Sequence, residues 1–130
     1  MIGGDIVPDV KNEFSILSGD QLAAFIAIRL RAKRLVYGVD VDGIFDTNPS
    51  LDSKAQLLKG LTPVSAARLV SKATSGTTPD VTGGMAGKIR EAILVARHRI
   101  PVYFVNLRKD ERLRKAAFGQ EVLCSRIMPT

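Results

Sequence analysis

The sequence predicts an α/β fold with a mainly parallel sheet that is covered by helices on both faces. Strand-like apolar runs alternate along the chain with segments whose apolar residues recur at helical spacing, and Gly, Asp and Pro lie between them. One short run, residues 35–39, is mostly apolar, which is typical of a central strand. With 130 residues, residues 1–130 are expected to form a single domain with its own core.

The first elements are two short strands and a helix. Residues 5–8 and 14–17 have strand character and are joined by a polar turn. Ser18 is a candidate helix N-cap, and Gln21, three residues later, completes the pattern of a capping box. Residues 22–28 are apolar on nearly every face of this helix, so we expect the helix to be deeply buried.

The second half of the chain continues the alternation. Thr62 and Pro63 have the pattern of an N-cap followed by a first-turn proline. Gly119 is expected to stop a short basic helix. In order, the expected elements are a weak strand or turn near residues 57–61, a helix over 62–72, a loop over 73–82, a helix from Gly83 to about residue 99, a strand over 101–105, a helix over 112–118 and a strand over 122–127.

The composition of the chain limits which binding partners and which cellular compartment are expected. The net charge of +6 suits an anionic partner, which could be nucleotide phosphate, nucleic acid or a membrane surface, although a merely basic surface is equally compatible. A single cysteine, Cys124, allows no internal disulfide and fits a reducing cytoplasmic setting, and its apolar neighbours predict a buried thiol. No apolar run reaches membrane-spanning length, so we expect a soluble protein. Of the three anionic partners, we do not expect a membrane.

The segment of residues 80–88 has the strongest chemical signal. Gly83 and Gly84 would let backbone N–H groups approach a ligand closely, and the helix that starts there points its positive end at the same place. Lys88 adds a full positive charge, so the segment suits phosphate. The spacing is not that of a P-loop, and a loop followed by a helix with an exposed lysine is the alternative.

An acidic loop over residues 40–49 follows the predicted strand. Asp40, Asp42 and Asp46 could hold Mg²⁺, accept hydrogen bonds from a ribose, or order the loop itself, and Phe45 could pack on an adenine ring. The spacing does not fit a calcium-binding loop. The alternative is a turn whose Asp side chains bond to their own backbone.

A third polar segment opens the first helix. Asp20 follows a strand and begins a helix, which places it near the carboxyl edge of the sheet, where ligands of such folds collect. The alternative is that Asp20 only complements the helix dipole. His98, the one histidine, lies between two arginines and is expected to be solvated, and no zinc-site spacing or catalytic triad can be assembled.

Taken in order, four segments resemble the C-terminal half of isopentenyl phosphate kinases, a branch of the amino acid kinase family. They are Gly4-Asp5-Ile6-Val7, Ser18-Gly19-Asp20, Asp40-Val41-Asp42-Gly43-Ile44 and Asp80-Val81-Thr82-Gly83-Gly84-Met85. The resemblance covers essentially the whole chain. It implies a three-layer αβα sandwich and ATP-dependent phosphorylation of a phosphate or carboxylate on a small molecule, which in this branch yields isopentenyl diphosphate. Glutamate, acetylglutamate and uridylate kinases belong to the same wider family.

The resemblance also implies roles for matching residues. Lys88 would contact the transferring phosphate and Asp20 would orient the catalytic lysines. Gly4 would border a small phosphorylated substrate, Mg²⁺ would accompany ATP, and no residue is assigned as a metal ligand. Val39 and Phe45 depart from the usual threonine and tyrosine, which removes two hydroxyl groups near the nucleotide. The residues implied to bind the nucleotide are Asp40, Phe45, Asp46, Thr47, Asn48, Pro49, Gly84 and Lys88.

The family's N-terminal half, with its glycine-rich loop, its lysine and a catalytic histidine, has no match in this sequence. The chain would thus be a fragment, a split-gene product or a relic, with negligible activity alone, and would assemble as a homodimer or with a complementary chain. A non-catalytic nucleotide-binding module is the main alternative. A nucleic-acid binder, based on the basic residues within 29–34 and 108–115, ranks last because aromatic residues do not interleave with them.

Overall fold

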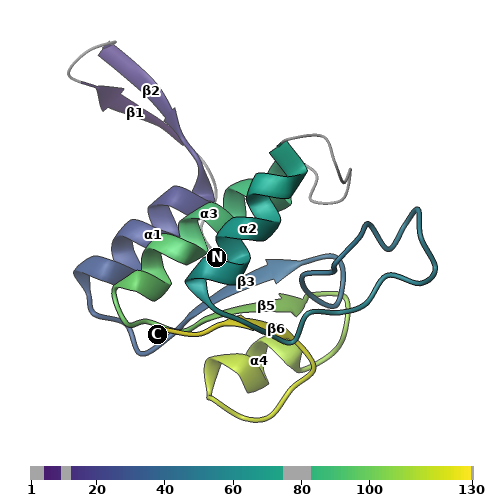
Figure 1. Cartoon of the computed structure of the whole chain (residues 1–130). Helices are drawn as coiled ribbons and strands as arrows, with labels where there is room; N and C mark the ends of the chain where they lie inside the picture. Colours follow the sequence, from purple (N-terminus) through teal and green to yellow (C-terminus); the bar gives the residue numbers. More distant parts are fainter. Residues whose placement is uncertain (1–4, 10–12, 75–82, 130) are drawn as a thin grey trace.

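The computed structural model describes residues 5–9, 13–74 and 83–129. Strands and helices alternate through most of this part of the chain, as the sequence predicts (Figure 1). In order, the elements are β1 (Asp5–Asp9), β2 (Glu13–Leu17), α1 (Gly19–Arg29), β3 (Leu35–Val39), β4 (Gly60–Leu61), α2 (Pro63–Thr74), α3 (Gly83–Arg97), β5 (Val102–Asn106), α4 (Arg112–Ala117) and β6 (Ser125–Ile127).

The main sheet has four strands in the order β3-β5-β6-β4. β3 pairs with β5, and β4 with β6, in parallel, whereas β5 and β6 are antiparallel, so the prediction of a mainly parallel sheet is confirmed. β1 and β2 form a separate antiparallel hairpin. β3 lies at an edge of the described sheet and not at its centre as predicted. Its apolar character comes from packing on the sheet face, because Tyr37 and Val39 enter the main core.

The helices form two unequal layers around the sheet. α1, α3 and α2 cover one face and the short helix α4 covers the other (Figure 1). The main core lies under the three helices and is centred on Ile89, Phe104 and Ile127. A smaller cluster of Val105, Ala116 and Cys124 lies on the α4 side, so Cys124 is buried as expected. The observed order of layers is helices, sheet and one helix, which is an αβα arrangement.

The start of α1 confirms the predicted capping box. The backbone N–H of Gln21 donates to Ser18 Oγ (3.1 Å), and the backbone N–H of Ser18 donates to Gln21 Oε1 (3.4 Å). The predicted deep burial of the helix is wrong for its outer face. Ala24 and Ala27 are buried, but the side chain of Phe25 is 62% exposed, because the described chain covers α1 mainly from the side of α3 and β3.

Other element boundaries differ from prediction by a few residues. The backbone N–H of Ser65 donates to Thr62 Oγ1 (3.1 Å), which fits the predicted start of α2, and this helix runs two residues beyond the predicted end. β6 begins at Ser125 because Val122 and Cys124 instead pack in the cluster beside α4. The predicted loop of residues 73–82 lies largely outside the described residues. His98 is exposed, as expected.

Candidate functional site

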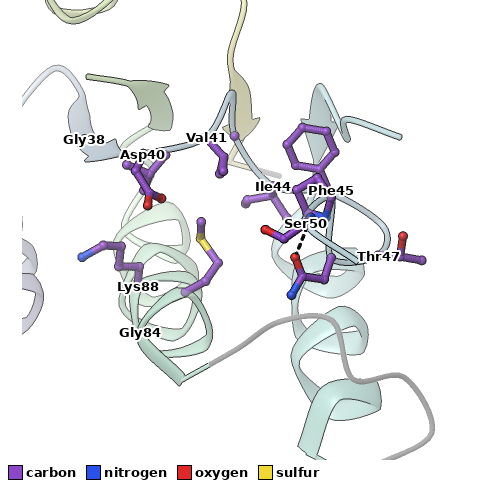
Figure 2. A pocket seen from close by; sticks show the side chains of 14 residues that line it. Gly38, Asp40, Val41, Ile44, Phe45, Thr47, Ser50, Gly84 and Lys88 are labelled. Atoms are coloured by element: carbon purple, nitrogen blue, oxygen red, sulfur yellow. Dashed lines mark hydrogen bonds between the residues drawn. The ribbon is translucent and has the colours of Figure 1, made fainter. Parts of the chain in front are cut away.

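A cleft of about 520 Å³ lies beside the carboxyl end of β3, between the loop that follows it and the first turns of α3 (Figure 2). Asp46 does not line the cleft, since its Oδ1 accepts a hydrogen bond from the backbone N–H of Gln56 (2.8 Å). Gly4 lies outside the described residues. The residues predicted to bind a nucleotide that do line the cleft are Asp40, Phe45, Thr47, Asn48, Pro49, Gly84 and Lys88.

The two ends of the cleft differ in chemistry. Figure 2 shows Asp40 and Lys88 at one end and Phe45 and Thr47 at the other. Gly84 lies in the first turn of α3, where backbone N–H groups have no partner within the helix and the helix dipole is positive. The charged end therefore suits an anionic group, and the end with the phenyl ring suits a flat apolar one.

Lys88 and Asp20 form an ion pair although they are 68 residues apart. The distance from Lys88 Nζ to Asp20 Oδ1 is 2.8 Å, and the two side chains are 27% and 24% exposed. Lys88 and Gly38 also line a second groove, of about 510 Å³, which contains Asp20. The structure therefore joins the two residues that the sequence resemblance implied to be catalytic, at the boundary between two cavities.

Tyr37 of β3 lies against this ion pair. Its hydroxyl donates to the backbone carbonyl of Asp20 (2.9 Å), and Lys88 Nζ lies 5.9 Å from the centre of its ring. Burial, and then the negative charges of Asp20 and Glu91, raise the pKa of Tyr37 well above its ordinary value of about 10. The hydroxyl consequently remains a hydrogen-bond donor throughout the physiological pH range.

The acidic loop is held by partners that are distant in sequence. Asp42 Oδ1 accepts hydrogen bonds from the Nδ2 group of Asn106 (3.2 Å) and from the guanidinium of Arg112. These two bonds, that from Asn106 first, lower the pKa of Asp42 below its ordinary value. The alternative in which the Asp side chains of this loop bond to their own backbone therefore does not describe Asp42. Asp40 is the one carboxylate among the described residues that line the cleft.

Buried Ser125 is a second support of the loop that the sequence did not reveal. Its hydroxyl accepts a hydrogen bond from the backbone N–H of Ile44 (2.7 Å) and donates to the carbonyl of the same residue (3.3 Å). A Cβ atom on Gly43 would lie 2.4 Å from Ser125 Oγ. The only sequence signals are a serine that interrupts an apolar run and a glycine in an acidic loop, and neither identifies its partner.

A third cavity, of about 830 Å³, lies away from this cleft. It is mainly basic at its rim, with Lys59, Arg112, Lys115 and Arg126 set against Asp110 and Glu121. The guanidinium of Arg126 lies 5.4 Å from the centre of the Tyr103 ring. This groove shares no lining residue with the cleft, so a ligand at one site can be distinguished experimentally from a ligand at the other.

Two kinds of feature are absent from the described part of the chain. No helix within residues 5–9, 13–74 and 83–129 is long and apolar enough to cross a membrane. Over the same ranges, no group of three or more His, Cys, Asp or Glu side chains is placed to hold a metal ion.

Comparison with known proteins finds small-molecule kinases among the similar sequences and among the similar structures. Isopentenyl phosphate kinase from Methanothermobacter thermautotrophicus is 35% identical over 130 residues, which covers 98% of this chain and 47% of that relative. Glutamate 5-kinase from Streptococcus sanguinis is 34% identical over 105 residues, which covers 81% of this chain and 28% of that relative. A crystal structure of an isopentenyl phosphate kinase superposes with a TM-score of 0.72 at 32% identity, covering 95% of this chain and 43% of its own.

The chain therefore spans about half the length, or less, of the proteins that it matches. The similarity extends through the cleft, since the sequence model described as the amino acid kinase family matches residues 1–106, which include the acidic loop and the first turns of α3. The chain belongs to the amino acid kinase family.

Proposed function

We propose that the cleft binds Mg·ATP as the nucleotide-binding half of a small-molecule kinase. The observation that carries this proposal is the position of Lys88, whose ammonium group lies beside the first turns of α3 at the charged end of the cleft. The triphosphate would lie between this ammonium and the backbone N–H groups near Gly84, which is a combination suited to phosphate. The nucleoside would extend toward Phe45 and the loop of Thr47, Asn48 and Pro49, with Asp46 ordering that loop.

Phosphoryl transfer depends mainly on positioning and on positive charge around the phosphates. Lys88 would stabilise the negative charge of the transferring phosphoryl group, and Asp20 would hold its ammonium in place. Asp40 is positioned to accept a hydrogen bond from the nucleotide or to contribute one oxygen to Mg²⁺. The described residues that line the cleft provide a single carboxylate, so the remaining ligands of the ion would be phosphate oxygens and water, as is usual for Mg²⁺ bound with nucleotides. When bound, Mg²⁺ would neutralise phosphate charge.

The substrate that we propose is isopentenyl phosphate. The support is the similarity to isopentenyl phosphate kinases, which covers almost the whole chain. The γ-phosphoryl group of ATP would pass to the terminal phosphate of the substrate, giving ADP and isopentenyl diphosphate, with Gly4 bordering the substrate. A glutamate, acetylglutamate or uridylate kinase is the alternative within the family. The lone buried thiol of Cys124 is compatible with a cytoplasmic enzyme.

A partner surface forms part of this proposal. The outer edge of β3 has no paired strand in the described part of the chain, and the groove beside it is lined by Leu35, Val36, Leu107 and Leu113. Leu107 and Leu113 are 49% and 46% exposed. We propose that this edge is covered by the remainder of the kinase domain, supplied by the same polypeptide or by a second one, and that the 130 residues alone associate with another copy.

Light scattering of the 130-residue chain at low micromolar concentration tests this surface. We expect a dimer or larger species, together with binding of a dye that reports exposed apolar surface, because open strand edges and apolar patches drive association. Leu107→Lys should reduce both signals, whereas Leu51→Lys, at an exposed leucine outside the groove, should not. A monomer that melts cooperatively and binds no dye would contradict the proposal.

Calorimetric titration with Mg·ATP tests the role of Lys88. We expect the wild-type chain to bind in the millimolar range or tighter, and Lys88→Ala to weaken binding by about 1–3 kcal/mol, since it removes a charged contact to phosphate. Lys33→Ala is the matched control, because Lys33 is an exposed lysine that does not line the cleft. Equal binding by wild type and Lys88→Ala, or no heat with folded wild-type protein, would refute the proposal.

If the chain binds nucleotide but never transfers phosphate, the second candidate is a non-catalytic nucleotide-binding module. The observation that favours it is the limited coverage of the relatives, since this chain matches less than half of the isopentenyl phosphate kinase sequence. The two candidates share the cleft and differ only in whether a complementary half completes it.

A further inference from the structure

Three elements converge on one side chain next to the cleft. Tyr37 comes from β3, Asp20 from the first turn of α1, and Lys88 from α3. Tyr37 contacts each of the other two residues with a different part of its side chain. Its hydroxyl bonds to the backbone of Asp20, and its ring lies within cation–π distance of the Lys88 ammonium.

We propose that Tyr37 is a positioning residue that fixes the Lys88 ammonium at the charged end of the cleft. The hydroxyl sets the position of the Asp20 backbone, the Asp20 carboxylate then holds the ammonium at 2.8 Å, and the ring face limits the ammonium from a second side. The ligand that benefits, a nucleoside triphosphate, rests on the proposed function. The positioning of Lys88 itself is a property of the chain without ligand.

The ring and the hydroxyl of Tyr37 have separable roles. The ring is part of the core, with 5% of the residue exposed and its centre 5.5 Å from that of Phe104. The hydroxyl bonds to the backbone carbonyl of Asp20, which has a second lone pair for its helical hydrogen bond. Tyr37→Phe should therefore preserve the core and the cation–π contact while releasing the Asp20 backbone.

The chain contains a matched control for this substitution. The sequence has two tyrosines, Tyr37 and Tyr103, and Tyr103 lies on β5 beside Arg126 and does not line the cleft. Tyr103→Phe removes the same atom from a similar, strand-borne ring. An effect on Lys88 that appears in Tyr37→Phe and is absent in Tyr103→Phe is therefore specific to the hydroxyl of Tyr37.

Competitive acylation of lysines, read by mass spectrometry, tests the positioning without any nucleotide. In Tyr37→Phe we expect Lys88 to react about 3- to 10-fold faster relative to Lys33 and Lys115, a range that the loss of one net hydrogen bond supports. Tyr103→Phe should leave this ratio at its wild-type value. An unchanged ratio in Tyr37→Phe would overturn the inference, whatever the chain does with ATP.

A double-mutant cycle then tests the link to the ligand. Tyr37→Phe should weaken Mg·ATP binding about 3- to 10-fold and leave adenosine binding unchanged, with no further loss in the Lys88→Ala background, because the tyrosine acts through the lysine. Equal losses for ATP and adenosine, or additive losses with Lys88→Ala, would show a general distortion and overturn the inference. Absence of ATP binding by the wild type would instead refute the proposed function, and the acylation ratio would still decide the role of Tyr37.

Discussion

The isolated chain should show no detectable phosphoryl transfer from ATP to isopentenyl phosphate. Preorganised charges around the reacting phosphates are each worth roughly 10²- to 10³-fold in rate, and Lys88 is the one cationic side chain among the described residues that line the cleft. Addition of a polypeptide that corresponds to the other half of the isopentenyl phosphate kinase relative should raise the rate by at least about 10³-fold, because it would provide more than one such group. The measurement is formation of radiolabelled isopentenyl diphosphate with and without that polypeptide.

Two controls make this assay decisive. The mixture that contains Lys88→Ala should lose the gained activity, whereas the mixture with Lys33→Ala should retain it. Robust turnover by the pure chain that disappears in Lys88→Ala would mean that the 130 residues form a complete kinase site. Activity in the mixture that is insensitive to Lys88→Ala would mean that the chemistry takes place elsewhere.

Gly43→Ala should destabilise the protein and disrupt the nucleotide loop together. The added Cβ would lie 2.4 Å from Ser125 Oγ and 2.9 Å from the backbone nitrogen of Ser125, which is fully buried, and Gly43 has a φ of +154°. Overpacking of this kind costs about 1–3 kcal/mol. Because Ser125 also holds the backbone of Ile44, the loop beyond it should shift and Mg·ATP binding should fall.

Gly60→Ala is the matched control, since a Cβ at Gly60 would meet no atom within 4 Å. Chemical denaturation should show a lower free energy of unfolding for Gly43→Ala than for wild type, and little change for Gly60→Ala. Equal stability of the two variants would contradict the packing described for the loop.

The sequence was sufficient to predict those structural features that depend on residues close together along the chain. Ser18 and Gln21 are three residues apart, so their capping box could be predicted, and it is present. The alternation of apolar runs likewise gave the order of strands and helices. The resemblance to the kinase family implied that Asp40 and Lys88 belong to one nucleotide site, and both residues line one cleft.

The sequence was insufficient to predict interactions between residues that are far apart along the chain. Asp42 is bound by Asn106 and Arg112, which are 64 and 70 residues away, and no local pattern indicates either of them. The edge position of β3 also depends on distant partners, because it is decided by which strands pair. The apolar residues of β3 show only that helices pack on this strand, not where it lies in the sheet. The exposure of Phe25 has the same origin, because a helix pattern does not tell how many of its faces will be covered.

Amide chemical-shift mapping of the ¹⁵N-labelled chain with Mg·ATP tests the central claim most directly. We predict that chemical-shift changes concentrate in residues 38–50 and 84–88, which surround the cleft. The chemical shifts of amides around the separate basic groove of Lys59, Lys115 and Arg126 should not change. Shifts confined to the basic groove would indicate a general anion site on this surface and contradict the proposed nucleotide site. Absence of any shift at millimolar Mg·ATP would contradict it as well.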